Sequence, residues 1–382
     1  MSGFANKAAI AGIGQTEFSK NSGRSPLQLA AEASLAALDD AGLKPADVDG
    51  MVLFTVEDNE EGDILKTLGI PGLSWSARVG LGGGGSAGAV FQAAAAIASG
   101  AAETVLILRA FNERSENRFG QASNKKLSSY GWNGSAFNYF VWSMPFGVMT
   151  PAAMISMANL PYMRKYGVTN EDFGHYVVTA REHAATNPAA WYHGRPITLA
   201  DHQASKWIVE PVVRLLDCCQ ESDGGAALVL TSVERARDLA QKPAVVRGGA
   251  WDVRPGGSMG LAAREDLVAE RLWRSAGMGP QDVSLAMLYD AFTPEVFTQT
   301  EAYGFCKPGE AKDFYRGGEG RLGLLPKLTP LGKFAQIVQK ALACNTMQLI
   351  GEMESWPRLM TAGTWDVAIS CLGTTIRSEE RR

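Results

Sequence analysis

The sequence predicts an α/β protein made of two similar lobes, with a different kind of segment inserted between them. The chain has 382 residues, which is more than one ordinary hydrophobic core requires. The pattern A-G-x-x-P-x-D-V occurs twice, at 41–48 and at 276–283, each time between a predicted helix and a predicted strand. An internal duplication explains this recurrence more simply than chance does.

Each copy of the pattern belongs to a predicted helix–turn–strand unit. In the first lobe, an apolar strand at 8–14 is followed by a helix that starts after Ser25 with proline in its first turn, and the strand 50–54 follows the turn. In the second lobe, the helix runs from about 264 to 275 and the strand begins at 285. In this register Phe54 of the first lobe corresponds to Tyr289 of the second.

A run of glycines leads into a helix that carries no charge, over 79–99. Because such a helix has no polar face for solvent, we expect it in the centre of the core, ending at Gly100. The glycines remove side chains from its N-terminus, where backbone N–H groups and the positive dipole end collect, and this makes room for a ligand. A flexible linker and a dinucleotide loop are weaker interpretations, since an apolar helix follows and no ribose-binding acid is suitably placed.

Aromatic residues, methionine and asparagine are abundant from 111 to about 212, unlike the flanking sequence. Helices are predicted at 151–166 and from Thr169 to Asn187. We interpret this region as an insertion whose aromatic side chains pack locally or line an apolar pocket. The predicted domains are 1–118, completed by 213–240, as the first lobe, 119–212 as the inserted domain and 241–382 as the second lobe.

Composition excludes several classes of protein. A net charge of −4 gives no basic surface for nucleic acid. No apolar run reaches the length of a membrane span and the N-terminus lacks a signal pattern, so a cytoplasmic protein is expected. Neither the five cysteines nor the four histidines have the spacing of a disulfide framework or a metal site, and buried thiols are expected instead.

Several runs together resemble the thiolase superfamily, and most closely its lipid-transfer-protein-like branch, the sterol carrier protein thiolases. They are A-I-A-G-I-G-Q-T-E-F from residue 8, A-L-D-D-A-G-L-K-P-A-D-V-D-G, R-A-F-N-E-R-S at 109–115, D-C-C-Q-E-S-D-G-G-A-A-L, and L-Y-D-A-F-T with Y-G-F-C-K-P-G-E at 288–310. The resemblance extends from residue 8 to about 326. It implies a five-layered αβαβα fold of two duplicated lobes with an inserted loop domain, and a tight homodimer.

The chain lacks two catalytic parts that the thiolase resemblance leads one to expect. The nucleophilic cysteine of that family lies at the N-terminus of the central helix, and this slot falls at about Gly83. No cysteine is near it, Ser86 has no local base, and no histidine follows His202. Acyl transfer through a thioester is therefore not expected, and Gly83, Gly84 and Ser86 are predicted to leave space for substrate.

The third catalytic slot holds Tyr289, which resembles the branch of aldolases that shorten steroid side chains. Tyr289 is predicted to act as the base that takes the hydroxyl proton or as the acid that protonates the enolate. A core tyrosine is the alternative. Asp290 is a further catalytic candidate, although a turn or helix-cap role is favoured for it, and Phe292 is predicted to contact the substrate.

The C-terminal part both supports and complicates the resemblance. The loop after the strand 365–369 carries Cys371, in the place of a second thiolase cysteine or as a buried small residue, and Gly373, whose N–H is predicted to face the oxyanion. In the aldolase branch a second catalytic tyrosine is expected, but Val338 occupies that slot and Lys340 occupies that of a histidine.

The sequence thus predicts a retro-aldolase that splits a β-hydroxyacyl-CoA of a steroid side chain into a ketone and a shorter acyl-CoA. Coenzyme A enters as part of the substrate, and no other cofactor and no metal are expected. By resemblance, a small OB-fold/zinc-ribbon protein is the expected partner. The alternatives are a thiolase-like acyltransferase and a non-catalytic subunit that binds CoA-lipids or serves as a scaffold.

Overall fold

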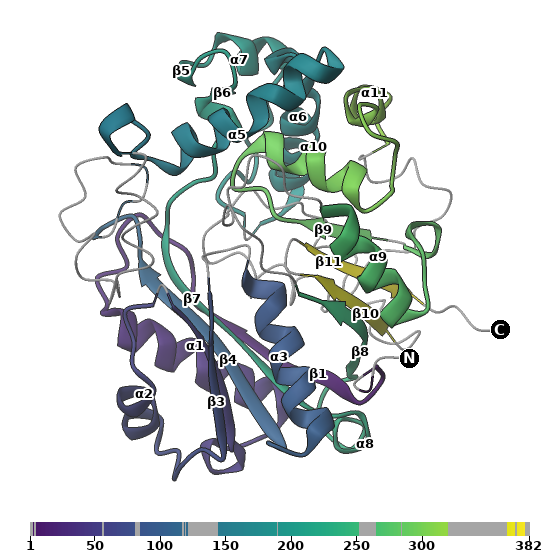
Figure 1. Cartoon of the computed structure of the whole chain (residues 1–382). Coiled ribbons are helices and arrows are strands. Elements are labelled where there is room, and N and C mark those ends of the chain that lie inside the picture. The colour runs from purple at the N-terminus through teal and green to yellow at the C-terminus, as the bar shows by residue number, and fades with distance from the viewer. Residues whose placement is uncertain are drawn as a thin grey trace.

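The computed structural model describes most of the chain, and Figure 1 shows its arrangement. The described residues are 3, 5–55, 57–80, 85–116, 118, 120, 144–188, 190–251, 265–283, 285–319, 365–370 and 373–378. A mixed sheet with helices packed on both faces forms the body, and a group of helices covers one end of it. This arrangement confirms the α/β fold class.

Both lobes contribute to a sheet of nine strands. In sheet order these are β3 (Trp75–Val79), β2 (Gly50–Phe54), β4 (Thr104–Asn112), β7 (Asp223–Ser232), β1 (Ala8–Gln15), β8 (Ala244–Ala250), β10 (Trp365–Ser370), β11 (Gly373–Ser378) and β9 (Leu285–Leu288). The two lobes meet where β1 pairs with β8, antiparallel, over Ala9–Val245 and Ile10–Ala244.

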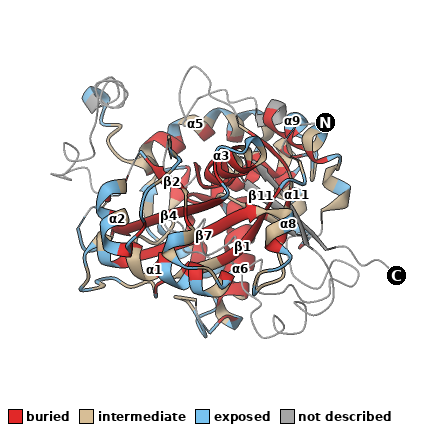
Figure 2. Cartoon of the chain, turned by 90° about the horizontal axis from the view of Figure 1, so that it is seen from below, coloured by how far each residue is buried: buried red, intermediate tan, exposed pale blue. Residues whose placement is uncertain are grey.

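The helices of the first lobe lie on opposite faces of the sheet. One face is covered by α1 (Pro26–Ala41), α2 (Glu61–Leu68) and α8 (Val233–Ala236), and the other by α3 (Ser86–Ser99). Figure 2 shows α3 and the central strands buried, whereas α1 and α2 keep exposed outer sides. Helix α1 approaches β1 closely at Gly14, where an added Cβ would lie 2.0 Å from the Ala33 carbonyl oxygen. The predicted central position of the uncharged helix is confirmed.

The duplicated unit is present in both lobes with the same local contacts. Helix α9 (Glu265–Ala276), the 3₁₀ turn η7 (Pro280–Asp282) and β9 repeat the arrangement of α1, η1 (Pro45–Asp47) and β2. The aspartate of the pattern fixes each turn: Asp47 accepts the Lys44 N–H at 2.8 Å, and Asp282 accepts the Gly279 N–H at 2.9 Å.

The equivalence does not extend to the last two strands of the second lobe. In the first lobe, β4 lies parallel beside β2, and β7 lies between β4 and β1. In the second lobe, β10 lies parallel beside β8, and β11 is the strand that pairs with β9. The order of these two strands is therefore reversed.

The segment between β4 and β7 builds a separate group of helices at one end of the sheet. It contains η4 (Met144–Phe146), α5 (Pro151–Tyr166), α6 (Asn170–Thr186), α7 (Leu199–Ala204), β5 (Trp207–Val209), β6 (Val213–Arg214) and η5 (Leu215–Asp217). Helices α10 (Thr293–Ala302) and α11 (Ala311–Arg316) of the second lobe pack against it. The predicted helices at 151–166 and after Thr169 are confirmed, while the domain boundaries themselves remain predictions.

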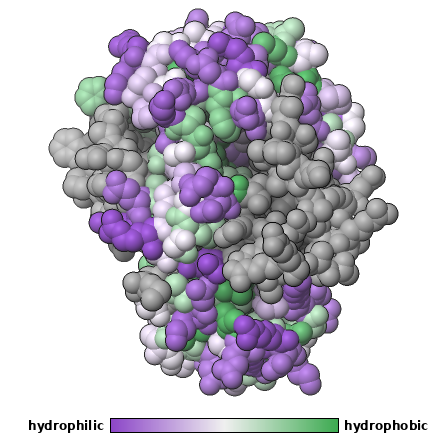
Figure 3. Space-filling model, turned by 90° about the vertical axis from the view of Figure 1, so that its right-hand side faces the viewer, coloured by the Kyte–Doolittle hydropathy of each residue, from purple (hydrophilic) through white to green (hydrophobic). Residues whose placement is uncertain are grey.

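Aromatic side chains of the inserted helices pack against those of the second lobe. The ring of Phe173 meets that of Phe297 edge to face at 4.9 Å, and Tyr176 meets Tyr315 at 5.3 Å. For these residues local packing is the correct alternative. In Figure 3, which views the right-hand side of Figure 1, hydrophobic residues show between more hydrophilic upper and lower regions of that face.

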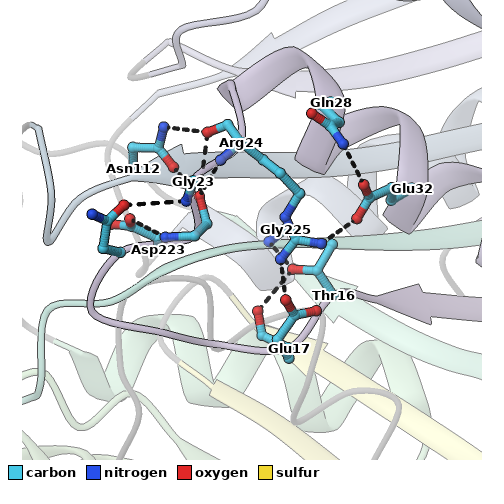
Figure 4. A network of polar contacts seen from close by, with 11 residues as sticks. Thr16, Glu17, Gly23, Arg24, Gln28, Glu32, Asn112, Asp223 and Gly225 are labelled. Carbon is cyan, nitrogen blue, oxygen red and sulfur yellow. Dashed lines mark hydrogen bonds and ion pairs between the residues drawn. The ribbon is translucent and has the colours of Figure 1, made fainter.

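The start and end of the insertion are tied together at the edge shown in Figure 4. Asn112, the last residue of β4, pairs with Asp223, the first residue of β7. The Asp223 carboxylate accepts the N–H groups of Ser22 at 3.0 Å, Arg114 at 2.9 Å and Ser115 at 3.0 Å. The two strands therefore leave the sheet from a fixed point.

Two expectations from composition meet the structure here. Cys218, Cys219 and Cys306 are half-buried rather than buried, and the other two cysteines lie outside the described side chains. In the parts of the chain that the structure describes, no helix combines the length and the apolar character needed to cross a bilayer.

Candidate active site

Tyr289 is the residue that follows β9 and lies in the short connection to α10. In Figure 1 the labels of β9 and α10 lie below the inserted helices. The side chain of Tyr289 is half-buried and packs against the apolar cluster that α5, α6, α10 and α11 share. The Phe54 side chain, its counterpart in the first lobe, is 2% exposed and belongs to a different apolar cluster, with α3. Only the second copy therefore presents a partly accessible aromatic group.

The surroundings of Tyr289 keep its phenol protonated. Burial raises its pKa well above 10, electrostatic interaction with Glu295, and with Cys219 and Glu113 when they are ionised, acts in the same direction, and Arg109 opposes it. A phenol with so high a pKa holds its proton at neutral pH. The sequence left two roles open for Tyr289, a base or an acid. This environment favours the acid, because a protonated phenol can donate a hydrogen bond or a proton.

Asp290 has the properties of a base poised near neutral pH. The residue as a whole is half-buried, and burial of its carboxyl group raises the pKa to about 7, although the hydroxyl of Tyr176 on α6 donates to it at 3.2 Å and lowers the pKa. The helix-cap interpretation is wrong, because the N-cap of α10 is Phe292. Asp290 instead joins the second lobe to the insertion.

Two buried ionisable residues interact electrostatically with Tyr289: Arg109 on β4 and Glu113 just beyond the end of that strand. The Arg109 guanidinium lies 5.0 Å and 4.8 Å from the ring centres of Phe54 and Phe111. Glu113, two positions beyond Phe111 on the same alternation, is 3% exposed, and burial raises its pKa well above the usual range. The sequence analysis used the run 109–115 only for its resemblance to a family and did not predict Arg109 or Glu113 as site residues. The signal that could have identified them is the occurrence of charged residues at alternate positions along an apolar strand.

Cys219 is a thiol that interacts electrostatically with Tyr289, and it is a poor nucleophile. Its N–H donates to the Ala291 carbonyl at 2.9 Å, so it lies beside the segment that carries Tyr289 and Asp290. Burial raises its pKa well above the usual range, with Glu113 next in effect. A thiol that stays protonated reacts slowly with a thioester, because the thiolate is the reactive form.

The structure describes three of the other predicted site residues. Ser86 is the first residue of α3 and is 5% exposed. Phe292 is 8% exposed, packs in the cluster of the inserted helices and forms a backbone bridge with Cys218. Gly373 begins β11 opposite Leu288, one residue before Tyr289. Gly83, Gly84, Cys371 and Val338 lie outside the described residues.

The arrangement combines a proton donor with a proton acceptor on adjacent residues. Within the described parts of the chain, no group of three histidine, cysteine or carboxylate side chains is placed to hold a metal ion. Tyr289 and Asp290 are half-buried residues, and their enclosure by protein strengthens electrostatic interactions with a bound ligand. Such a pair can move a proton off one atom of a ligand and onto another.

Comparison with known families and proteins gives consistent matches. Residues 262–336 match the family described as thiolase C-terminal domain-like. The chain is 50% identical to a steroid side-chain-cleaving aldolase of Thermomonospora curvata over 332 residues, covering 85% of this chain and 84% of that protein. It is 47% identical to a 17-hydroxy-3-oxo-4-pregnene-20-carboxyl-CoA lyase of Mycobacterium tuberculosis, covering 83% of each.

A solved structure extends the similarity to the whole chain. The Ltp2-ChsH2(DUF35) aldolase superposes with a TM-score of 0.81 and 42% sequence identity, covering 100% of both chains. This similarity includes the regions on both sides of the insertion.

Proposed function

The chain belongs to the thiolase superfamily, in the family of the steroid side-chain-cleaving aldolases, and we propose from this premise that it cleaves a β-hydroxyacyl-CoA derived from a steroid side chain. The products are a ring ketone and a shorter acyl-CoA. The observation that carries the proposal is the accessible acid–base pair of Tyr289 and Asp290, placed where the sequence has no thiolase nucleophile.

In the proposed reaction Asp290 takes the proton of the β-hydroxyl group. The electron pair of that O–H bond forms the ketone C=O, and the bond between the α and β carbons breaks. Its electrons move to the α carbon and the thioester oxygen as an enolate, which hydrogen-bond donors stabilise. Tyr289 donates a proton to the α carbon, and the proton on Asp290 returns through solvent to restore both groups. No covalent enzyme intermediate is required.

Thiolase-like acyl transfer is the less favoured alternative. That chemistry needs a reactive thiolate, but the sequence has glycine at position 83 and no histidine after His202. The high pKa of Cys219 argues against that thiol as a substitute. A non-catalytic CoA-lipid-binding or scaffold role is the other alternative, and it predicts that substitution of Asp290 or Tyr289 changes binding alone.

The proposal includes the surroundings of the reaction. Coenzyme A takes part as the thioester of the substrate, and Gly83, Gly84, Ser86, Phe292 and Gly373 line the space for it and for the ketone half. We also propose a cytoplasmic homodimer and an OB-fold/zinc-ribbon partner. The name of the Ltp2-ChsH2(DUF35) aldolase joins two components, and this supports a partner for the present chain.

Mass spectrometry of reaction products tests the function. The purified protein, with and without its candidate partner, is incubated with a tertiary β-hydroxyacyl-CoA that carries a steroid ring system. We expect a ring ketone and acetyl-CoA or propionyl-CoA in equal amounts. Unchanged substrate in both samples, with tight binding measured in parallel, would support the non-catalytic alternative instead.

The variant Asp290→Asn distinguishes a catalytic role of Asp290 from a role in stability. We expect the turnover number to fall by about 10²–10³-fold, as for loss of a general base. Stability should not fall with it: burial raises the pKa of Asp290 from 3.8 to about 7, so ionisation of this group destabilises the folded state progressively between those two pH values, and the loss is complete above pH 7. At pH 8 the variant should therefore unfold at or above the wild-type temperature, and wild-type turnover in Asp290→Asn would exclude this base.

A further inference from the structure

Gln299 makes two hydrogen bonds to the backbone of Tyr289. It lies on α10 and is 2% exposed. Its side-chain oxygen accepts the Tyr289 N–H at 3.0 Å, and its Nε2 group donates to the Tyr289 carbonyl at 2.6 Å. If the Gln299 amide were flipped, its NH₂ group would face the Tyr289 N–H and its oxygen would face the Tyr289 carbonyl. The two backbone groups therefore define the orientation of the amide.

These bonds continue the sheet one residue beyond its last paired position. Among the described residues, the pairing of β9 with β11 covers Leu285–Leu288, and Tyr289 is the next residue. At Tyr289 the side chain of Gln299 supplies the donor and the acceptor that a neighbouring strand would supply. A buried peptide group left without partners is strongly unfavourable, so the direction of the backbone at Tyr289 depends on this amide.

The other end of the same short segment is also held. The Cys219 N–H donates to the Ala291 carbonyl at 2.9 Å, and Cys218 forms a backbone bridge with Phe292. The segment 289–292 is therefore fixed at both ends, and the side chains of Tyr289 and Asp290 leave it between the two anchors.

We propose that Gln299 is a positioning residue that sets the direction of the Tyr289 and Asp290 side chains toward the substrate, and this inference rests on the proposed function. A change in backbone direction at Tyr289 moves the phenol oxygen by more than it moves the backbone, because the ring projects far from the Cα atom. Misplacement of a reacting group by about 1 Å costs on the order of 10²-fold in rate.

A neighbouring residue separates positioning from general stability. Thr300 follows Gln299 on α10 and is 1% exposed. Its hydroxyl bonds the Val296 carbonyl at 2.7 Å and the Tyr315 hydroxyl at 2.6 Å, on the side of the inserted helices. Thr300→Val removes buried hydrogen bonds from the same turn of the same helix without changing the partner of Tyr289, and it serves as the matched control.

The experiment compares Gln299→Asn, Gln299→Glu and Thr300→Val in the full-length protein with its candidate partner. Gln299→Asn keeps the amide but is one methylene too short, and we expect about 10- to 100-fold lower kcat with KM within about twofold. Thr300→Val should show a similar drop in Tm with kcat within about twofold of wild type.

Gln299→Glu adds a readout that loss of stability would not produce. A protonated glutamic acid can again accept the Tyr289 N–H and donate to its carbonyl, whereas the carboxylate can only accept. We therefore expect the ratio of variant kcat to wild-type kcat to rise as pH falls. This variant also decides the matter if Gln299→Asn does not fold.

The outcomes distinguish this inference from the function on which it rests. Wild-type protein that forms no ketone contradicts the proposed function itself. Active wild type with normal kcat in Gln299→Asn, or equal losses of kcat in Gln299→Asn and Thr300→Val at equal Tm, overturns the positioning role alone. A ratio independent of pH in Gln299→Glu also counts against it.

Discussion

The same helix–turn–strand unit ends at a buried core residue in one lobe and at the proposed acid–base pair in the other. Phe54, at the end of β2, is almost completely buried, and the Arg109 guanidinium stacks over it. Tyr289, one residue past β9, is half-buried and is followed by the half-buried Asp290. The unit therefore supplies a rigid strand end, and the residues placed on that end decide its use.

Each strand end also has a nearby carboxyl group, Glu57 in the first lobe and Asp290 in the second, and these two groups differ in the same way. Burial raises the pKa of Glu57 to about 7, as it does for Asp290. Glu57, however, is 8% exposed and accepts the Asn59 side-chain amide at 2.6 Å, the Asp58 N–H at 3.1 Å and the Ala110 N–H at 3.4 Å. A pKa near neutrality marks both groups, and accessibility to a ligand distinguishes the candidate catalytic one.

Tyr289→Phe makes the second strand end resemble the first, and we expect the largest effect from it. Loss of the proton donor should lower kcat by about 10³-fold, with ligand binding retained. Initial rates of ketone formation and binding of a CoA thioester to the variant measure the two properties separately. Wild-type turnover would remove Tyr289 from the mechanism.

Tyr176→Phe removes the contact that only the second strand end makes with the insertion. The Tyr176 hydroxyl stabilises the Asp290 carboxylate, so its loss should raise the pKa of Asp290 further. The rise of kcat/KM with pH, centred near 7 in wild type, should move upward by about one unit, and the deficit should be largest below pH 7. A pH profile with an unchanged midpoint would contradict the assignment of Asp290 as base.

Phe54→Tyr makes the first strand end resemble the second, and it should have the smallest effect on catalysis. The new hydroxyl enters an apolar cluster and should cost about 1–3 kcal/mol of stability. The turnover of folded protein should stay within about twofold of wild type. Urea unfolding and kcat measure these quantities, and a large loss of kcat at low denaturant would show that the two strand ends are not separate in function.

The elements that local signals define were predictable from the sequence. Ser25 accepts the Gln28 N–H at 3.2 Å as the cap of α1, Gly42 ends that helix with φ of 73°, and the apolar run 86–99 is a buried helix. The aspartates of the repeated pattern act within four residues, so the duplicated turns were also predictable.

The partners of the site residues depend on tertiary packing that the sequence does not express. Asp290 was predicted as a turn or helix-cap acid because it precedes a helix, yet its partner is Tyr176, on an inserted helix. Gln299 and Glu113 have no local signature that connects them with Tyr289. The strand order of the second lobe likewise depends on long-range pairing, since a repeated local unit does not specify which strand lies beside it.

The contacts of Asp223 fix the point from which the inserted helices leave the sheet, so these helices can vary without changing the sheet. Asn112 and Asp223 are paired on adjacent strands, so the insertion leaves the sheet and returns to it at neighbouring positions. The three N–H groups that donate to the Asp223 carboxylate hold this junction in place. Lengthening a loop closed in this way costs little entropy, since the cost grows only with the logarithm of its length. Evolution or engineering can therefore vary the inserted helices, and with them Tyr176, while the strand ends that carry the proposed acid–base pair keep their register.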